Sequence, residues 1–391
     1  MTVAAGALDR LVEERLAERT RANAAFFAAE ADRIARLCHR CAERFARGGR
    51  LLAAGGTPAA RSDARHVAVE FVHPVIVGKR ALPALALEPE DVALAARPED
   101  MVIGFGGAPL GGARAQGCLT IAFDDTPGAE WAFLPPTDDA FVAQELAETL
   151  YHLVWELVHV FFEHRGLLEG RTPEPRHDGG AASFLYPFLD EAQDDLDAVL
   201  ADVGASVRMK AQEVGALRER TLTGGREVLL AAAGALRAAL DAGGTVLTLG
   251  NGGSATDAMD LVADLRTPPA DRGWPARRAL DLGADPAILT ALANDVGPQV
   301  LFSRQVIAYA RPGDALVAFS TSGGSENVLH ALTEARRRGL ATVAIAGYDG
   351  GRVAADGLAD HIIIAPSQHI PRVQEAQASV AHLLRHLLEV V

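Results

Sequence analysis

Residues 315–347 read ALVAFSTSGGSENVLHALTEARRRGLATVAIAG, and this stretch decides the fold class. An apolar strand at 315–319 leads through a Ser/Gly-rich loop into a helical pattern, and a second apolar strand follows at 341–347. Two strands joined by a helical connection of a dozen residues or more lie parallel in one sheet. We therefore predict an α/β protein with a parallel sheet flanked by helices.

An earlier part of the chain repeats the same pattern. The matching pairs of segments are 43–56 with 238–253, 62–71 with 256–265, and 97–105 with 311–319. The second and third pairs lie 194 and 214 positions apart, and Gln144 and His152 lie 230 positions before Gln374 and His382. An internal repeat whose offset grows indicates a duplicated unit in which the first copy has lost segments.

The lost segments predict a smaller first domain. In the first copy, MVIGF (101–105) leads through GGAPLGGARAQG straight into CLTIAF (118–123), which leaves too little chain for a full crossover helix. We expect two tandem three-layer α/β/α domains with parallel sheets, the first domain being reduced. The predicted division is 1–168 for the first domain, 169–183 for a Pro/Gly-rich linker and 184–391 for the second domain.

Composition limits the classes of function. The 391-residue chain carries a net charge of −14, which argues against a nucleic-acid protein, because that role needs basic residues to neutralise phosphates. Its 3 cysteines imply no disulfide framework. No run reaches the ~18 apolar residues of a membrane-spanning helix, and no apolar signal core begins the chain. We expect a cytoplasmic protein that binds neither a membrane nor nucleic acid directly.

Two glycine-rich loops in the second copy predict a phosphate site. GNGGSATDA (250–258) and STSGGSEN (320–327) each follow an apolar strand and open a helix. Glycine lets the backbone approach a ligand closely, and a helix N-terminus favours an anion. Four hydroxyl groups can donate to phosphate oxygens in the second loop, those of Ser320, Thr321, Ser322 and Ser325. Neither loop is a Walker A motif, since no GKS or GKT is present.

The second copy resembles a sugar isomerase (SIS) domain of the phosphoheptose isomerase family, which interconverts sedoheptulose 7-phosphate and a heptose 7-phosphate. The segments that carry the resemblance are GNGGSATDAM, ALANDVG, FSRQV, STSGGSENV, GYDGG and RVQEAQASVAH, spread over about 245–385. Three segments, LTALAND, GYDGG and APSQHIPRVQE, are also similar to the replication-initiator-associating relatives of that family, which are binding proteins. The first copy resembles a reduced SIS domain more weakly.

The resemblance implies a set of substrate-binding residues. Phosphate binding falls to Ser254 with the neighbouring Gly252 and Gly253 amides, and to the four hydroxyl residues of the 320–325 loop. Three further residues stand at family site positions: Asn251, Asp295 and Gln374.

The resemblance also implies a zinc site. The family set is a helical His and Glu four residues apart, with a Gln and a His eight apart on the last helix. The first copy has all four ligand types, at His66, Glu70, Gln144 and His152. In the second copy the last helix conforms, with Gln374 and His382, but Asp260 and Asp264 replace the His and Glu.

Several interpretations of these residues stay open. The first-copy set can be a metal site with Glu70 as base and His152 as acid or ligand, or His66 and Glu70 can be an ordinary helical pair. The second-copy set, with Asp264 and His382 as catalytic groups, is an alternative metal site. A composite site would join the metal set of one half to the phosphate loops of the other.

Two functions follow from these alternatives. The first is a zinc-dependent aldose–ketose isomerase that acts on a heptose 7-phosphate or a related sugar phosphate. The second is a non-catalytic sensor of sugar phosphates, or an adaptor with a protein partner, as in the initiator-associating relatives. Since the resembling enzymes are tetramers of single domains, a homodimer of this two-domain chain is the expected assembly.

Overall fold

The computed structural model describes residues 5–75, 79–163, 168 and 195–391. They form two compact units. The second-copy unit contains residues 1–21, 140–145 and 214–391, and the first-copy unit contains 22–139 and 146–213. The linker predicted at 169–183 lies outside the described residues, and the predicted domain boundaries stay a prediction.

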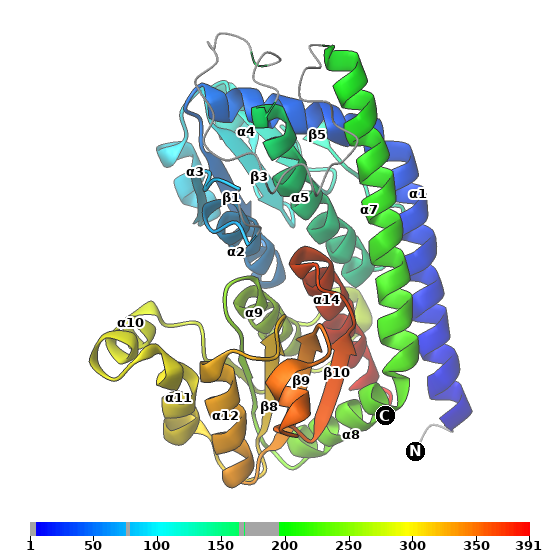
Figure 1. Ribbon diagram of the computed structural model, residues 1–391, viewed down its shortest axis with the longest axis vertical. Helices are drawn as coiled ribbons and strands as arrows, with labels where there is room; N and C mark the ends of the chain where they lie inside the picture. Colours follow the sequence, from blue (N-terminus) through cyan, green and yellow to red (C-terminus); the bar gives the residue numbers. More distant parts are fainter. Residues whose placement is uncertain (1–4, 76–78, 164–167, 169–194) are drawn as a thin grey trace. The chain divides into compact units, whose positions relative to one another are not determined.

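Both units contain one five-stranded sheet in which every paired strand is parallel, as predicted (Figure 1). The order is β2-β1-β3-β4-β5 in the first-copy unit and β10-β9-β8-β6-β7 in the second-copy unit. The first-copy strands are β1 (Leu51–Gly55), β2 (Ala84–Leu87), β3 (Met101–Phe105), β4 (Leu119–Ala122) and β5 (Trp131–Ala132). The second-copy strands are β6 (Val246–Leu249), β7 (Ala279–Asp281), β8 (Ala315–Ser320), β9 (Ala341–Gly347) and β10 (His361–Ala365). When β1 to β5 are matched in turn with β6 to β10, the two sheets have the same strand order. This agreement confirms two related folds in one chain.

One buried aspartate in each copy makes the same backbone contacts. The carboxylate of Asp100 accepts hydrogen bonds from the backbone N–H groups of Arg50 and Arg97, at 2.8 and 2.9 Å. Asp314 accepts from Thr245 and Arg311 at 2.8 and 2.7 Å. In both copies, therefore, an aspartate at the start of the central strand holds the start of the neighbouring strand.

Helices cover these sheets. In the first-copy unit they are α2 (Pro58–Val72), α3 (Pro89–Ala95) and α4 (Gly111–Ala115). In the second-copy unit they are α8 (Arg226–Asp241), α9 (Gly253–Arg266), α10 (Pro286–Asp295), α11 (Leu301–Tyr309), α12 (Glu326–Arg337), α13 (Gly351–Ala355) and α14 (Ile370–Leu387). Three helices have residues in both units: α1 (Ala5–Ala46), α5 (Ala140–Glu163) and α7 (Leu196–Gly224).

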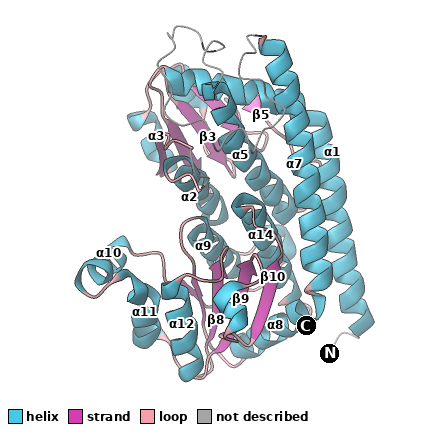
Figure 2. Cartoon of the chain, in the orientation of Figure 1, coloured by secondary structure: helices cyan, strands magenta, loops and turns pink. Residues whose placement is uncertain are grey.

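The second-copy sheet is the middle layer of three, as Figure 2 shows. Along β8, Ala315, Val317 and Phe319 pack with residues of α8, α9 and α14. The alternate residues Leu316 and Ala318 pack with residues of α11 and α12 on the other face. Because successive side chains of a strand point to opposite faces, a strand buried on both faces reads as a continuous apolar run.

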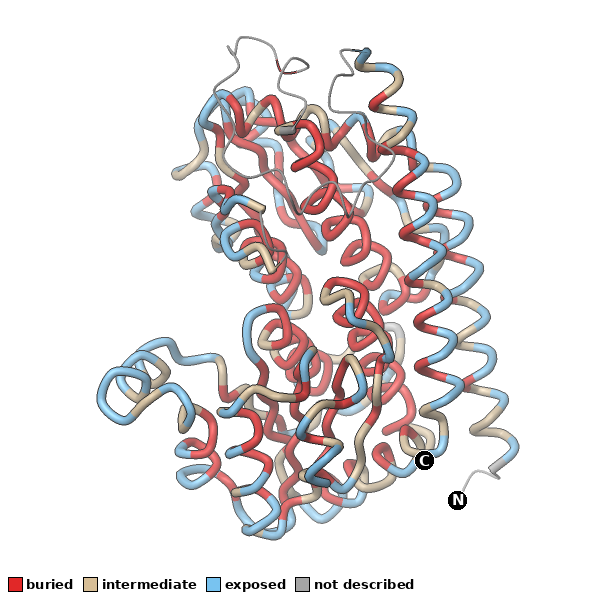
Figure 3. The backbone as a smooth tube through the Cα atoms, in the orientation of Figure 1, coloured by how far each residue is buried: buried red, intermediate tan, exposed pale blue. Residues whose placement is uncertain are grey.

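The helices α14 and α10 contrast sharply in burial (Figure 3). Every residue of α14 from Pro371 to Leu387 is buried, including charged ones, whereas none of the ten described residues of α10 is buried.

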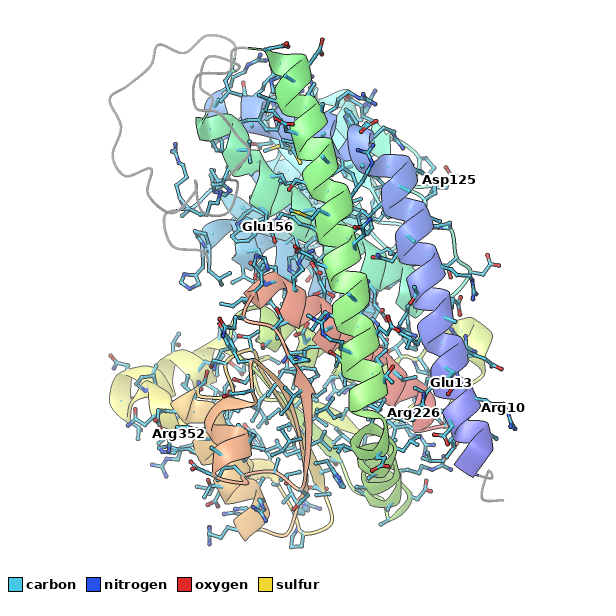
Figure 4. All side chains as sticks on the ribbon, turned by 45° about the vertical axis from the view of Figure 1, so that its right-hand side comes forward. Arg10, Glu13, Asp125, Glu156, Arg226 and Arg352 are labelled. Carbon is cyan, nitrogen blue, oxygen red and sulfur yellow. The ribbon has the colours of Figure 1, made fainter. Side chains whose placement is uncertain are left out.

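At the start of α8, Arg226 pairs with Glu13 of α1 at 3.1 Å, near the surface (Figure 4). None of the described helices is both long enough and apolar enough to cross a lipid bilayer.

The reduction of the first copy is visible at one crossover. Between β3 and β4 the chain makes only the five-residue helix α4, whereas the twelve-residue α12 joins β8 to β9. The short connection still keeps β3 and β4 parallel and adjacent.

From the sequence we predict two helices at the start of the second copy, at 187–203 and 206–241, and the structure corrects both. The helix predicted at 206–241 is broken at Gly225, where α7 ends and α8 begins, because paired glycines disfavour a helix interior. The helix predicted at 187–203 has its first part outside the described residues, and from Leu196 onward its sequence continues without a break into α7.

Candidate functional site

The predicted phosphate loops lie at the carboxyl ends of β6 and β8 in the second-copy unit. Within the 320–325 loop, the Ser320 and Ser322 hydroxyl oxygens accept hydrogen bonds from the Gly323 and Gly324 amides, at 3.1 and 3.2 Å. Asn251 of the first loop exchanges two side-chain hydrogen bonds with Asn327, each 2.9 Å long. This reciprocal amide pair joins the two loops into one surface.

The N-terminus of α9 differs from its counterpart in the first copy. Thr57 caps α2, because its side-chain oxygen accepts from the Ala60 amide at 3.1 Å. Gly252, with φ of 57°, precedes α9, and within the described part of the chain no side chain caps that helix. The Ser254 and Ala255 amides donate to the Asn251 and Gly252 carbonyls at 3.1 and 2.9 Å, so an anion at this helix start would be favoured by the helix dipole and by the lack of a competing side-chain cap.

A buried carboxylate–histidine cluster lies farther along α9. His382 Nε2 lies 3.1 Å from Asp260 Oδ2 and 3.9 Å from Asp264 Oδ2. The Gln144 amide donates to Asp260 Oδ1 at 3.0 Å. The ligand atoms of Asp260, Asp264 and His382 all lie within 4.8 Å of one another, so these residues could hold a metal ion.

Glu145 contacts the other nitrogen of His382, with 2.9 Å between Nδ1 and Oε1. Arg19 donates to the Glu145 carboxylate in a bidentate arrangement, with distances of 2.7–3.0 Å. The Ser379 hydroxyl lies 2.6 Å from Glu145 Oε2 and accepts from Arg218 Nε at 2.9 Å. Two arginines and a serine therefore surround the carboxylate that faces His382.

These charges shift the pKa values in the cluster. Burial alone would raise the pKa of Glu145, but Arg19 and the hydrogen bond to His382 hold it well below its usual range. Burial alone would lower the pKa of His382, but its bonds to Asp260 and Glu145 raise it well above 6.5. Burial and then the Asp260 charge raise the pKa of Asp264 well above its ordinary value. These shifts favour a charged His382 beside the Glu145 carboxylate, and Asp264 binds a proton more tightly than an ordinary aspartate does.

Helix α14 connects this cluster to the phosphate loops. The Gln377 amide donates to the Ile345 carbonyl of β9 at 2.9 Å, and it lies 3.5 Å from the Ser320 carbonyl at the end of β8. His382 follows five residues later on the same helix. On α9, Ser254, Asp260 and Asp264 are buried, and Asp260 and Asp264 share one face because they are four residues apart.

A second cluster forms in the first-copy unit. His66 Nε2 lies 3.3 Å from His152 Nε2 and 3.8 Å from Glu70 Oε1, and all three residues are buried. Their ligand atoms all lie within 4.8 Å of one another. Glu148 Oε1 lies 4.0 Å from His66 Nδ1, and the Tyr151 ring packs edge-on against both imidazoles. The predicted helical pair is therefore part of a buried cluster that could hold a metal ion.

The donor set of this first-copy cluster fits zinc. Two histidines with one glutamate form a common catalytic zinc set, and two nitrogens bound at about 2.0–2.1 Å to a tetrahedral ion lie roughly 3.3 Å apart. The His66–His152 separation of 3.3 Å equals that edge. The second-copy set has two aspartates and one histidine, and such oxygen-rich sites also suit harder divalent cations.

The first-copy loop 106–112 offers no comparable phosphate site. It lacks hydroxyl residues, and its Gly107 amide donates at 2.8 Å to the carboxylate of Asp124. Asp124 in turn accepts from the Thr126 hydroxyl. A carboxylate already occupies an amide of this loop, which disfavours a second anion there.

The structure divides the predicted metal set between the two units. It brings His66, Glu70 and His152 together, but Gln144 belongs to the second-copy unit, where it bonds to Asp260. Gln374 is buried on α14, whereas Asp295 is exposed at the end of α10. Thr321 and Ser325 are half-buried and Ser322 is exposed, as suits a ligand-binding loop.

Sequence reasoning missed the residues around His382. The omitted ones are Arg19, Glu145, Arg218 and Ser379, and beside the glycine-rich loops Asn327 was also omitted. One signal was available, because the dipeptide Gln-Glu occurs at 144–145 and again at 374–375. Arg19 and Arg218 had no sequence signal, since they come from helices distant in the chain.

Sequence comparison agrees with this geometry. Residues 211–347 match the SIS domain family. The phosphoheptose isomerase of Rhodospirillum rubrum is 44% identical over 158 residues, which are 40% of this chain and 82% of that protein. The phosphoheptose isomerase of Solidesulfovibrio magneticus is 41% identical over 184 residues, which are 46% of this chain and 85% of that protein.

Solved structures that match nearly the whole chain support the two-domain fold. The C-terminal domain of glucosamine-fructose-6-phosphate aminotransferase from Francisella tularensis has a TM-score of 0.57 at 10% identity, covering 97% of this chain and 95% of that one. Tagatose-6-phosphate ketose/aldose isomerase from Escherichia coli has a TM-score of 0.53 at 14% identity, covering 100% and 94%. At these identities the likeness concerns the fold alone. The sequence relatives and the matched domain together show that this chain belongs to the phosphoheptose isomerase family of SIS-domain proteins.

Proposed function

We propose that this protein is a metal-dependent aldose–ketose isomerase of a sugar phosphate, with a heptose 7-phosphate as the leading substrate. One observation carries the proposal. The hydroxyl-rich loops lie at the starts of α9 and α12, and the Asp260/Asp264/His382 cluster lies on α9 and α14, all within one compact unit. This reaction needs a phosphate-binding end and an acid–base end in one unit, and α9 contributes to both.

The spacing of the two ends suits a sugar phosphate. Ser254 and Asp260 are six residues apart on α9, which is about 9 Å at a rise of 1.5 Å per residue. That length is comparable to the span from the phosphate to the first carbons of an extended hexose or heptose phosphate. A phosphate held at the start of α9 would therefore bring the reacting carbons toward the cluster.

The cluster contains the groups for proton transfer. Aldose–ketose exchange removes a proton from the carbon next to the carbonyl, forms an enediolate, and returns a proton to the neighbouring carbon. A carboxylate of the Asp260/Asp264 pair would be the base, with Asp264 the better candidate because Asp260 already bonds to Gln144 and His382. His382 would donate to the carbonyl oxygen.

Two residue sets could hold the metal of such an enzyme. The first-copy set, His66, Glu70 and His152, fits zinc, and the second-copy set, Asp260, Asp264 and His382, accommodates zinc or a harder divalent cation. A bound ion would supply electrophilic stabilisation of the negative charge that develops on oxygen. The sequence-based roles of Glu70 as base and His152 as acid remain a prediction.

A turnover assay tests the proposed function. The full chain, purified without chelator and supplied with zinc, manganese or magnesium, is mixed with sedoheptulose 7-phosphate, and aldose formation is followed. We expect turnover with at least one metal, and its loss in Asp264→Asn. Thermal stabilisation by the sugar phosphate with no turnover under any metal would overturn the isomerase proposal.

A non-catalytic sensor is the second candidate, and one observation favours it. Both Asp260 oxygens are engaged, one by Gln144 and one by His382, and aspartates replace the longer His and Glu side chains of the resembling enzymes. Such a site can bind a sugar phosphate without moving protons. The assay above separates the two functions, because only the isomerase converts the ligand.

We also propose a homodimer as the assembled form, which would place four SIS-type sheets in one particle, as in a tetramer of single domains. Sedimentation or light scattering of the full chain tests this assembly. A mass of about 41 kDa, that of one chain, would contradict it.

A further inference from the structure

We propose that Glu145, a residue of the last helix of the first copy, is the positioning residue that fixes the orientation of His382 and keeps its Nδ1 protonated. The proposal rests on the proposed function only in treating His382 as the acid. Its structural part, the control of one imidazole by one carboxylate, stands on contacts within the second-copy unit.

Glu145 reaches the nitrogen of His382 that points away from Asp260. The Nδ1–Oε1 distance is 2.9 Å, and Nε2 on the opposite side of the ring lies 3.1 Å from Asp260. An ionised carboxylate only accepts hydrogen bonds, so Nδ1 must carry a proton to bond with it. Glu145 thereby directs Nε2 toward the two aspartates, where the proposed proton transfer takes place.

Glu145 is itself held firmly. Arg19 binds its carboxylate in a bidentate fork, and the Arg218 guanidinium donates to its backbone carbonyl at 3.2 Å. Both arginines are nearly inaccessible, with exposed fractions of 3% and 2%. A carboxylate with this many fixed donors cannot change rotamer without breaking several charge-assisted bonds, so it defines the position of its imidazole partner.

A ring contact from the same helix turn restricts His382 further. Phe141 stacks on the imidazole with ring centroids 4.6 Å apart and planes 8° from parallel. Phe141, Gln144 and Glu145 all belong to residues 140–145, the part of α5 that lies in the second-copy unit. One turn of the first copy thus contributes a stacking ring, an amide to Asp260 and a carboxylate to His382.

This arrangement gives the first turn of α5 a role. Residues 140–145 supply three side chains that complete the cluster of the second-copy unit. Groups that orient a catalytic or metal-binding histidine from behind typically change activity or metal affinity by roughly 10–100-fold when they are removed. We expect Glu145 to act in this range.

Nuclear magnetic resonance of the histidine side chains tests the proposal without needing activity. The full chain is labelled with ¹⁵N-histidine, and the His382 signals are identified by their absence in His382→Gln. Glu145→Asp is the main variant, because it keeps a carboxylate for the two arginines but shortens its reach toward Nδ1. Glu145→Ala removes the acceptor completely, and Glu156→Asp is the matched control, a buried glutamate of the same helix that pairs with Lys210 at 2.7 Å.

We expect a protonated Nδ1 in the wild type, and a shifted or exchange-broadened Nδ1 signal in Glu145→Asp and in Glu145→Ala. The Glu156→Asp spectrum should keep the wild-type His382 signals. With turnover established, Glu145→Asp should lower kcat roughly 10–100-fold with KM little changed.

An unchanged His382 Nδ1 signal in both Glu145 variants would overturn the proposal, whatever the activity. A changed signal in a protein without turnover would uphold the positioning role and count against the isomerase alone. Thermal unfolding of each variant identifies any general loss of structure, which Glu145→Asp should avoid because it retains the charge between Arg19 and Arg218.

Discussion

The two buried histidine clusters of this chain differ in the groups that contact their imidazole rings. In the first-copy unit, His66 and His152 face each other at 3.3 Å beside Glu70. In the second-copy unit, His382 faces carboxylates with both of its nitrogens. Two neighbouring imidazole nitrogens favour a shared metal ion. An imidazole between carboxylates is favoured in its protonated form, because the carboxylates balance its positive charge.

The loops at the carboxyl ends of the strands also differ between the two copies, and here it is the second copy that has the features of an anion site. The second-copy loops have four hydroxyls and an uncapped helix start, while the first-copy loops have a threonine cap on α2 and a carboxylate on Gly107. Among the described residues, neither half therefore combines the hydroxyl-rich loops with a pair of facing histidines. Five experiments test this difference between the two halves.

The largest expected effect distinguishes His382 of α14 from His152 of α5. His382→Asn should lower kcat by roughly 10²–10⁴-fold, the usual contribution of a general acid or base, because it removes the proposed proton donor. His152→Asn, its counterpart 230 positions earlier, is the matched variant. Steady-state kinetics on both decide the assignment, and a larger loss in His152→Asn would transfer catalysis to the first-copy set.

Metal content gives the second contrast. His66→Ala and His152→Ala should each remove most of the bound zinc, because each leaves too few donors, whereas Asp264→Ala should retain it. Elemental analysis of protein purified without chelator measures the ratio of zinc to chain. Unchanged zinc in both histidine variants would rule out the first-copy metal site.

The buried ion pairs of α5 allow a stability comparison. Arg19→Met should destabilise the protein by about 3–5 kcal/mol, since it leaves the Glu145 charge buried without its bidentate partner. Lys210→Met, which removes the partner of Glu156, should cost less, because lysine offers a single point of contact there. Urea unfolding measures both, and a greater loss in Lys210→Met would contradict the central role assigned to Arg19.

Histidine charge predicts opposite pH responses in the two units. Burial lowers the pKa of His159 on α5 to about 4, so it stays neutral when folded, while its unfolded value is 6.5. Its contribution to stability is therefore present above pH 6.5 and is lost as the pH falls toward about 4. The raised pKa of His382 acts the other way, since its contribution is present at low pH and is lost as the pH rises through the folded value.

Unfolding free energies between pH 4 and 7 test this prediction in the wild type and in His159→Gln. In the variant, the unfolding free energy should fall less steeply as the pH decreases from 7 to 4, because the variant no longer contains the neutral histidine. An identical slope in both proteins would show that His159 does not control acid stability.

The smallest effect concerns the helix starts. Thr57→Ala should cost about 1 kcal/mol, because it removes the cap of α2. Inorganic phosphate should raise the unfolding temperature of the wild type and of Thr57→Ala equally, since the proposed anion site is at α9 and not at α2. A phosphate effect that disappears in Thr57→Ala would place the anion in the first copy instead.

The central strands and the repeat could be predicted from the sequence. Strands such as β1, β3, β8 and β9 are buried on both faces, so their apolar runs are visible without a structure. The four strands that sequence reasoning did not predict, β2, β5, β7 and β10, are the edges of the two sheets. Edge strands are short and partly exposed, so they leave a weaker pattern.

The sequence by itself determined the internal repeat, the parallel α/β fold, the position of two glycine-rich loops at strand ends and the pairing of His66 with Glu70, because all of these depend on local spacing. Only the tertiary structure decided the partners of Gln144 and Glu145. Both stand eight or fewer residues before His152 on the same helix, yet they bond to Asp260 and His382, more than a hundred positions away. Such contacts arise when helices distant in the chain pack together, and no local pattern encodes them.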